Sequence, residues 1–193
     1  VEIENANTKT LTVNSKVEGN FDLALDGAGA KDFESTLGAG GGAKEIGDGA
    51  GASISWAATS TGATTFEGSV DTNSGLTAAK EVGAITFLEN VTISTDNTDT
   101  YLEQNSLVLS GMTFDSAGNI KFGLDGAVGA DILTLAAGNV EIENDTGKTL
   151  TVNSKVEGNF DLVLDGAGTK NFNSTLGAAN GGNKEIGDGT GAS

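Results

Sequence analysis

The sequence contains no cysteine and no histidine, and all ten of its basic residues are lysine, so arginine is absent as well. Without cysteine, neither disulfides nor thiolate metal sites can hold the fold together. Aromatic residues make up only 5% of the chain, with one Trp and one Tyr. The 37% of hydrophobic residues suffices for a core only if these residues are regularly placed.

Positive charge is also scarce, and the formal net charge is −17 over 193 residues. Nucleic acids and anionic membrane surfaces both require a positive protein face, so we expect neither as a partner. No run of apolar residues approaches the roughly 18 that a membrane span needs, so we expect no membrane insertion by this segment.

One long segment of the chain occurs twice. The stretch from Val1 to Leu23 matches the stretch from Val140 to Leu162 at all but three positions, and the similarity continues to the end of the chain with a single insertion. Nearly all differences fall at polar or small positions. We therefore interpret residues 1–139 as one full repeat and residues 140–193 as the start of the next, in a continuous solenoid without a linker, cut from a longer array.

The local pattern is an alternation of apolar and polar residues with a period of two, which predicts short strands buried on one side. Gly, Asn and Asp separate these segments and favour turns. The stretch GLTAAKEVGA is bounded by Gly and is interpreted as a loop. The predicted strands are VEIEN, TLTVN, FDLALDG, AITF, NVTIST, SLVLSGMTF and DILTLAAGNVEIEN.

A shorter period lies inside the long repeat. The stretches FDLALDG at Phe21, IKFGLDG at Ile120 and FDLVLDG at Phe160 align without gaps. Their spacings are close to multiples of about 20 residues, which indicates a coil of that length with two or three short strands, and seven such coils in each full repeat. The predicted fold is all-β, a parallel β-helix whose coils stack by hydrogen bonding. Tandem β-sandwich repeats are the alternative.

Three segments carry a resemblance to a known group: TTFEGSV (residues 64–70), residues 83–114 and DGAVGADILTLAAGNVEI (residues 125–142). Their spacing resembles the β-strand repeats of large bacterial surface proteins, the adhesins of the filamentous-haemagglutinin and autotransporter-passenger type. The resemblance implies a right-handed β-helix, secretion to the cell surface, and an adhesive or structural role. It implies no catalytic residue.

Some β-helices are polysaccharide lyases or hydrolases, so pairs of carboxylates were considered as catalytic groups. The pairs Glu2 with Glu4, Asp22 with Asp26, and Asp161 with Asp165 each have an even spacing, which places both members on one face of a strand. A solvated outer face explains the same alternation. The absence of His and Arg also removes the usual bases of such enzymes. We therefore expect no enzyme and name no catalytic residue.

Asp–Gly turns at Leu25–Gly29, Gly47–Ser53 and Leu124–Asp131 raise the question of calcium. The calcium-binding nonapeptide pattern is not matched, because Asp48 lies too far from the glycines before it. We expect these Asp residues to cap turns through the backbone, and we predict no cofactor and no specific metal ligand.

Two aromatic residues and three Asn residues complete the candidates. Trp56 and Tyr101 could stack on a sugar, although Trp56 lies at an even spacing from Ile54 and is expected in the core. The sequons at Asn90, Asn144 and Asn173 match the glycosylation pattern, but chance explains them in a chain rich in Asn and Thr.

The sequence thus predicts an extracellular or cell-surface segment that builds a stiff filament, stalk or surface layer with an adhesive role. Its expected partners are copies of itself or adjacent repeats end to end, and polysaccharide or a cell surface. A polysaccharide-binding module and a carbohydrate-active β-helix enzyme are the alternatives.

Overall fold

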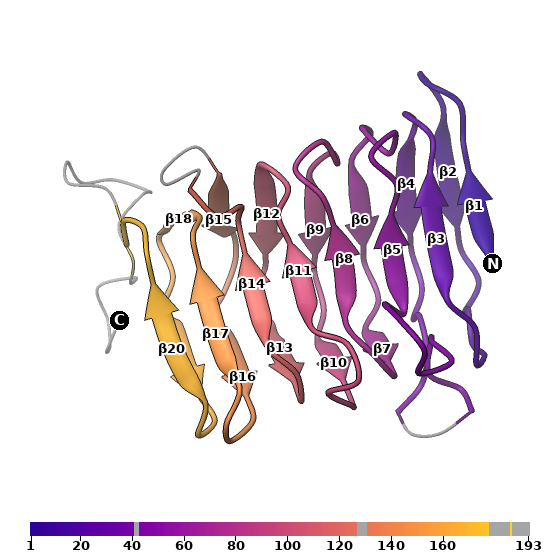
Figure 1. The fold of residues 1–193 in the computed structure, drawn as a ribbon. Coiled ribbons are helices and arrows are strands. Elements are labelled where there is room, and N and C mark those ends of the chain that lie inside the picture. Colours follow the sequence, from indigo (N-terminus) through magenta and orange to yellow (C-terminus); the bar gives the residue numbers. More distant parts are fainter. Residues whose placement is uncertain (41–42, 127–130, 178–185, 187–193) are drawn as a thin grey trace.

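The computed structural model describes residues 1–40, 43–126, 131–177 and 186. These residues form strands, turns and bends, and no helix. Figure 1 shows the strands stacked along one axis, from β1 to β20, with the chain winding around a single elongated core. All strand pairs are parallel, so the structure is a β-solenoid of eight turns and the predicted fold class is confirmed.

Each turn has three faces, and each face is a parallel sheet. The first face consists of β1 (Glu2–Glu4), β3 (Leu23–Asp26), β5 (Ile54–Trp56), β8 (Leu76–Ala78), β11 (Thr100–Leu102), β14 (Ile120–Phe122), β17 (Thr149–Val152) and β20 (Thr169–Phe172). The second face consists of β2 (Thr10–Val13), β4 (Ala30–Phe33), β6 (Thr64–Phe66), β9 (Ile85–Phe87), β12 (Ser106–Leu109), β15 (Ile132–Leu135) and β18 (Lys155–Gly158). The third face consists of β7 (Val70–Thr72), β10 (Val91–Ile93), β13 (Thr113–Ser116), β16 (Val140–Asn144) and β19 (Leu162–Asp165). In the first two turns, single bridges from Val17 to Leu37 and from Leu37 to Val70 stand in for strands of the third face.

The strand register sets the length of a turn. The predicted coil length is that of the shortest turns, such as the one in which Thr10 pairs with Ala30. Other turns are longer, because insertions at the corners add residues between the strands. The largest of these insertions precedes β5, where Leu23 pairs with Ile54. The length of a turn therefore varies along the stack while the pairing stays in register.

The core is a set of inward columns, in which one side chain from each turn stacks on its equivalent in the next. In the second face Phe33, Phe66 and Phe87 are aligned, with ring centroids 5.1 and 5.0 Å apart and nearly parallel planes. Phe114 and Phe122 extend this contact across the core to the other two faces through edge-to-face packing. Stacked turns place these rings at the strand spacing of about 4.8 Å, which favours aromatic contact.

Several predicted strands are confirmed, and two of them are divided. SLVLSGMTF forms β12 and β13 on two different faces, with Gly111 at the corner between them. DILTLAAGNVEIEN likewise forms β15 and β16. The interpretation of GLTAAKEVGA as a loop was wrong at its start, because Leu76–Ala78 is strand β8 with Leu76 fully buried. A solenoid corner takes only a few residues, so the alternation runs through it and hides the change of face.

The two copies of the repeat occupy different faces of the solenoid. VEIE forms β1 on the first face in one copy, whereas VEIEN forms β16 on the third face in the other. Each later strand of the second copy is shifted by one face in the same way. From β1 to β16 the chain makes five complete turns and crosses two further faces. The expectation of seven whole coils in each repeat was therefore wrong.

The internal alignment around Ile120 also differs from the structure. The ungapped alignment pairs Ile120 with Phe21, but the strand register stacks Ile120 in the same inward column as Leu23. The Asp–Gly turn at Asp125 consequently lies two residues further beyond its strand than the turn at Asp26 does. Sequence similarity at a corner does not fix the strand register, because the alternation of inward and outward residues within each strand sets the inward columns.

We expect Phe66→Ala to destabilise the solenoid by about 3–5 kcal/mol, because Phe66 is fully buried and stacks on both Phe33 and Phe87. Urea unfolding followed by circular dichroism measures the change. Thr65→Ala, which alters the outward residue of the same strand, is the control and should cost less than about 1 kcal/mol. Equal losses in the two variants would contradict the assigned facing.

Cysteine pairs test the shift between the two copies, since the chain has no native Cys. Asp115 pairs with Glu143 on the third face, so the double variant Asp115→Cys with Glu143→Cys should form a disulfide on mild oxidation. Lys121→Cys with Glu143→Cys is the control, because Glu143 would neighbour the first-face strand of Lys121 only if both copies had the same phase. Faster oxidation of the control pair, read by mass spectrometry, would show that the copies are not shifted.

Candidate functional site

The best-defined polar feature of both copies is an Asp–Gly corner, which we define as residues 26–31 and 165–170. Asp26 Oδ1 accepts a hydrogen bond from the N–H of Gly27 at 2.5 Å, and Asp165 Oδ1 accepts one from Gly166 at 2.6 Å. Both glycines have positive φ, 78° and 75°. A Cβ on Gly27 would lie 2.1 Å from a carbonyl oxygen of the preceding turn, so only glycine fits. The corner is the same although it joins different faces in the two copies.

A lysine completes each corner from inside. Lys31 is 1% exposed, and its Nζ donates to the carbonyl oxygens of Gly27 at 2.8 Å and Gly29 at 3.1 Å, and to Ser60 Oγ at 3.1 Å. Lys170 donates to the equivalent carbonyls of Gly166 and Gly168. Burial lowers the pKa of Lys31, and Asp26 partly opposes this. The lysine ties the corner together and points away from solvent, which suits a structural role.

The first two predicted carboxylate pairs do not form a site. Glu2 and Glu4 both point outward from β1, as their spacing predicts, and both are exposed. Asp22 and Asp26 lie at opposite ends of β3, about 13 Å apart along an extended chain. Asp22 accepts from the backbone of Asp48, whereas Asp26 accepts from the Thr59 hydroxyl and from Gly27, and these two hydrogen bonds lower the pKa of Asp26.

The third pair is divided between interior and surface. Asp161 is 8% exposed, and its Oδ1 has no hydrogen-bond partner among the described residues. Asp165 is exposed and caps Gly166. None of the three pairs therefore forms a reaction centre, because the extended chain holds the members of each pair apart or directs them to separate partners.

Carboxylates gather instead across strands, in an acidic column on the outside of the third face. Asp71, Thr92, Asp115, Glu143 and Asp165 are aligned in register on successive turns. Neighbouring members lie at the strand spacing of about 4.8 Å. Sequence reasoning missed this column because a whole turn of the chain separates each member from the next. The available signal was the outward position of each carboxylate in an alternating strand.

Like charges at this spacing oppose ionisation. Burial raises the pKa of Asp115, with further contributions from Asp145 and Glu141. The pKa of Glu143 is raised mainly by Asp115, and that of Asp71 by burial and by Glu45. The column therefore gives the third face a strong negative potential and costs the folded state stability at neutral pH.

Asp26, Asp48 and Asp131 cap backbone groups, as predicted, whereas Asp125 accepts hydrogen bonds from the side chains of Lys121 and Asn153. Asp48 Oδ1 accepts from the N–H of Ala50 at 2.9 Å, and Asp131 Oδ2 accepts from that of Leu124 at 3.0 Å. Within the described ranges, no group of three or more acidic residues has the geometry of a metal site. Residues 127–130 of the predicted turn Leu124–Asp131 lie outside the described residues. The effect of calcium on the protein stays a prediction.

The two large polar aromatics have different positions. Trp56 is 5% exposed, packs edge-to-face on Phe66, and its indole N–H donates to Thr64 Oγ1 at 3.0 Å. The interpretation of Trp56 as a core residue is therefore confirmed. Tyr101 lies on the outside of the first face, and its hydroxyl donates to Asp99 Oδ2 at 3.0 Å.

The three sequon asparagines also differ in position. Asn144 is fully buried, and its side-chain N–H donates to the carbonyl oxygen of Thr169 at 3.5 Å, so the folded protein offers no glycosylation site there. Asn90 and Asn173 are exposed, and both make hydrogen bonds to the adjacent turn.

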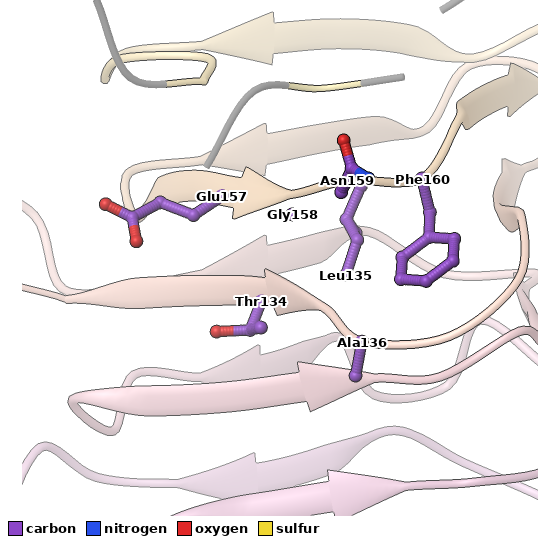
Figure 2. Close-up of a pocket in the computed structure, with 7 residues that line it drawn as sticks. All are labelled: Thr134, Leu135, Ala136, Glu157, Gly158, Asn159 and Phe160. Carbon is purple, nitrogen blue, oxygen red and sulfur yellow. The ribbon is translucent and has the colours of Figure 1, made fainter. Parts of the chain in front are cut away.

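A hollow of about 530 Å³ lies between two turns near the end of the stack. It is lined by Thr134, Leu135, Ala136 and residues 157–160, which Figure 2 labels. It lies where the inward column of the second face, which contains Phe87, Leu109 and Leu135, ends in Gly158. A Cβ on Gly158 would lie 2.4 Å from the carbonyl oxygen of Leu135. The hollow is thus explained by a close backbone contact with no side chain to fill the space.

No protein-family model matches the chain, and the searches of curated proteins and of solved structures likewise found no match. The described part of the chain contains no helix long and apolar enough to cross a membrane.

We expect Asp115→Asn to raise the free energy of unfolding at pH 7 and low salt, because it removes a partly buried charge that Asp145 and Glu141 also repel. A carboxyl whose folded pKa is raised costs stability above that pKa, and this cost disappears as the pH falls toward the ordinary value of about 3.9. The advantage of the variant should therefore be present at pH 7 and shrink as the pH is lowered to about 4. Urea titrations at both pH values measure it.

Asp26→Asn is the control for this experiment, because the pKa of Asp26 is lowered by its hydrogen bonds. Removing this stabilised charge should lower stability at pH 7. An Asp115→Asn variant that is less stable than the wild type at pH 7, with an effect that does not change with pH, would contradict the electrostatic account.

Proposed function

We propose that the chain is a structural segment of a long bacterial surface protein, in which stacked turns form a stiff filament, stalk or surface layer. The observation that carries the proposal is the pairing of the two copies of VEIE. β16 pairs with β13 on one edge and with β19 on the other. β1 has the same sequence and pairs with β3, the counterpart of β19. The other edge of β1 therefore corresponds to the edge of β16 that pairs with β13, and it can pair with the strand of a further turn in the same way.

The corners support a continuous stack. The Asp–Gly corner and its lysine keep the same hydrogen bonds in both copies, although the copies occupy different faces. A repeat that folds equally well in two phases needs no linker to adjust its orientation. Each added repeat continues the same backbone ladder and inward columns, so stiffness follows from nearest-neighbour contacts.

The acidic column supports the same role. Carboxylates on the outside of the third face repel equivalent faces of neighbouring rods, which keeps such rods soluble and separate. The extracellular location and an adhesive role come from the resemblance to bacterial surface repeats alone.

An enzyme is not proposed. Asp115 and Glu143 are neighbours at the strand spacing of about 4.8 Å, which is near the separation used by retaining glycosidases. However, these carboxylates lie along the outside of a sheet, and the hollow beside Gly158 does not include them.

Lengthening the chain tests the proposal. Inserting a second copy of residues 1–139 after residue 139 repeats the natural junction between the copies. We expect one continuous rod, longer by five and two-thirds turns or about 27 Å, measured as the maximum dimension in small-angle X-ray scattering.

The control carries the same insertion with ten Gly and Ser residues at the new junction, which introduces a flexible hinge. The direct insertion should scatter as a longer, stiffer particle than this control. Two hinged bodies in both proteins would contradict the proposal.

A further inference from the structure

The outside of the first face is unlike that of the third, because its outward column is mainly small and uncharged. Its members in register are Glu2, Ala24, Ser55, Thr77, Tyr101, Lys121, Thr151 and Asn171, of which only Glu2 and Lys121 are charged. Tyr101 is the one aromatic side chain among them, and it is 37% exposed. The small, uncharged side chains of Ala24, Ser55 and Thr77 therefore form a strip along the first face, and this strip ends at the ring of Tyr101.

A hollow of about 250 Å³ adjoins this ring, lined by Thr77, Ala78, Ala79, Tyr101, Glu103 and Lys121. It forms because Thr77 and Ala79 of the preceding turn are small, whereas Tyr101 rises from the next turn. The volume is below that of pockets for drug-sized ligands and suits one small ring.

The ring is held in a fixed position by its neighbours. Lys121 Nζ lies 5.0 Å from the ring centroid, and the Tyr101 hydroxyl donates to Asp99. Lys121 is itself fixed by Glu103 Oε1 at 2.6 Å and Asp125 Oδ2 at 3.3 Å. A ring that is already ordered loses little conformational freedom when a ligand stacks on it.

The charges around the ring select the ligand. Glu103 and Asp125 both pair with the ammonium group of Lys121, and a third carboxylate, that of Asp99, accepts from the Tyr101 hydroxyl. This excess of negative charge disfavours anionic ligands such as uronates or phosphates. The hollow also offers an aromatic surface with a carboxylate acceptor and a hydroxyl beside it. These groups fit the apolar C–H face and the hydroxyls of an uncharged sugar.

We propose that the hollow beside Tyr101 is a binding subsite for one neutral pyranose ring of a glycan that lies along the first face. The sugar stacks on Tyr101, and its hydroxyls contact Glu103 and Thr77. Further sugar units extend over the small side chains of Ser55 and Ala24. The subsite is independent of the proposed filament, because it lies wholly within three neighbouring turns.

The single tyrosine of the chain makes a direct test possible. With ¹³C-labelled tyrosine, the ring of Tyr101 gives the only labelled aromatic signals in an NMR spectrum. We expect these signals to shift on titration with cellohexaose or N-acetylchitohexaose, with a Kd of about 1 mM, and to stay unchanged with hexagalacturonate. No shift with either neutral oligosaccharide at about 20 mM, or a stronger response to hexagalacturonate, would overturn the proposal.

Variants separate stacking from other contacts, with binding followed by isothermal titration or by ligand-observed NMR. Tyr101→Ala should weaken binding about tenfold, and Thr77→Arg, which fills the hollow, should weaken it at least as much. Tyr101→Phe keeps the ring and should bind within about twofold of the wild type. Undiminished binding by Tyr101→Ala, or equal losses in the Phe and Ala variants, would overturn the stacking role. Thermal melting of each variant verifies that it is folded.

Discussion

The structure depends on the in-register hydrogen bonding between the backbones of successive turns. Every strand pairs in parallel with its equivalent one turn away, and this places like positions directly above one another at about 4.8 Å. Inward columns then become continuous apolar stacks, such as that of Phe33, Phe66 and Phe87. Outward columns likewise bring similar residues together, such as the carboxylates of the third face. The chemistry of each face therefore follows from one residue per turn.

The same constraint explains why an identical sequence is accepted on different faces. The three faces present nearly equivalent inward columns, and the corners are closed by local hydrogen bonds that move with the sequence. Asn5 shows this, because its side-chain amide donates to the carbonyl oxygen of Ala30, as Asn144 does to that of Thr169 in the other copy. Because one full repeat advances five and two-thirds turns, each copy is rotated by one face from the one before. In a longer array, features such as the acidic column would return to the same face after three repeats.

The contrast between the outer faces gives the proposed functions a common physical basis. On the third face burial raises the pKa of Asp115, and Asp115 in turn raises the pKa of Glu143, so keeping both carboxylates ionised costs the folded state stability. The first face carries the small neutral residues Ala24, Ser55 and Thr77 on the turns before Tyr101, so an uncharged glycan would meet little charge to desolvate along that strip. In the two proposals one surface keeps rods apart and another binds a glycan, and both surfaces depend on the same backbone ladder.

The sequence by itself determined the all-β class, the stacked parallel solenoid and the inward position of residues such as Leu23, Leu25 and Trp56, because period-two alternation and Gly, Asn and Asp at the turns act locally. It also indicated that Asp26 and Asp48 cap turns. Only the tertiary structure decided the length of each turn, the shift between the two copies, and the grouping of Asp71, Asp115, Glu143 and Asp165. These features depend on which residues lie one turn apart. Corner insertions change that spacing, as the short turn from Thr100 to Ile120 and the long one from Lys31 to Thr64 show, and the local pattern contains no record of it.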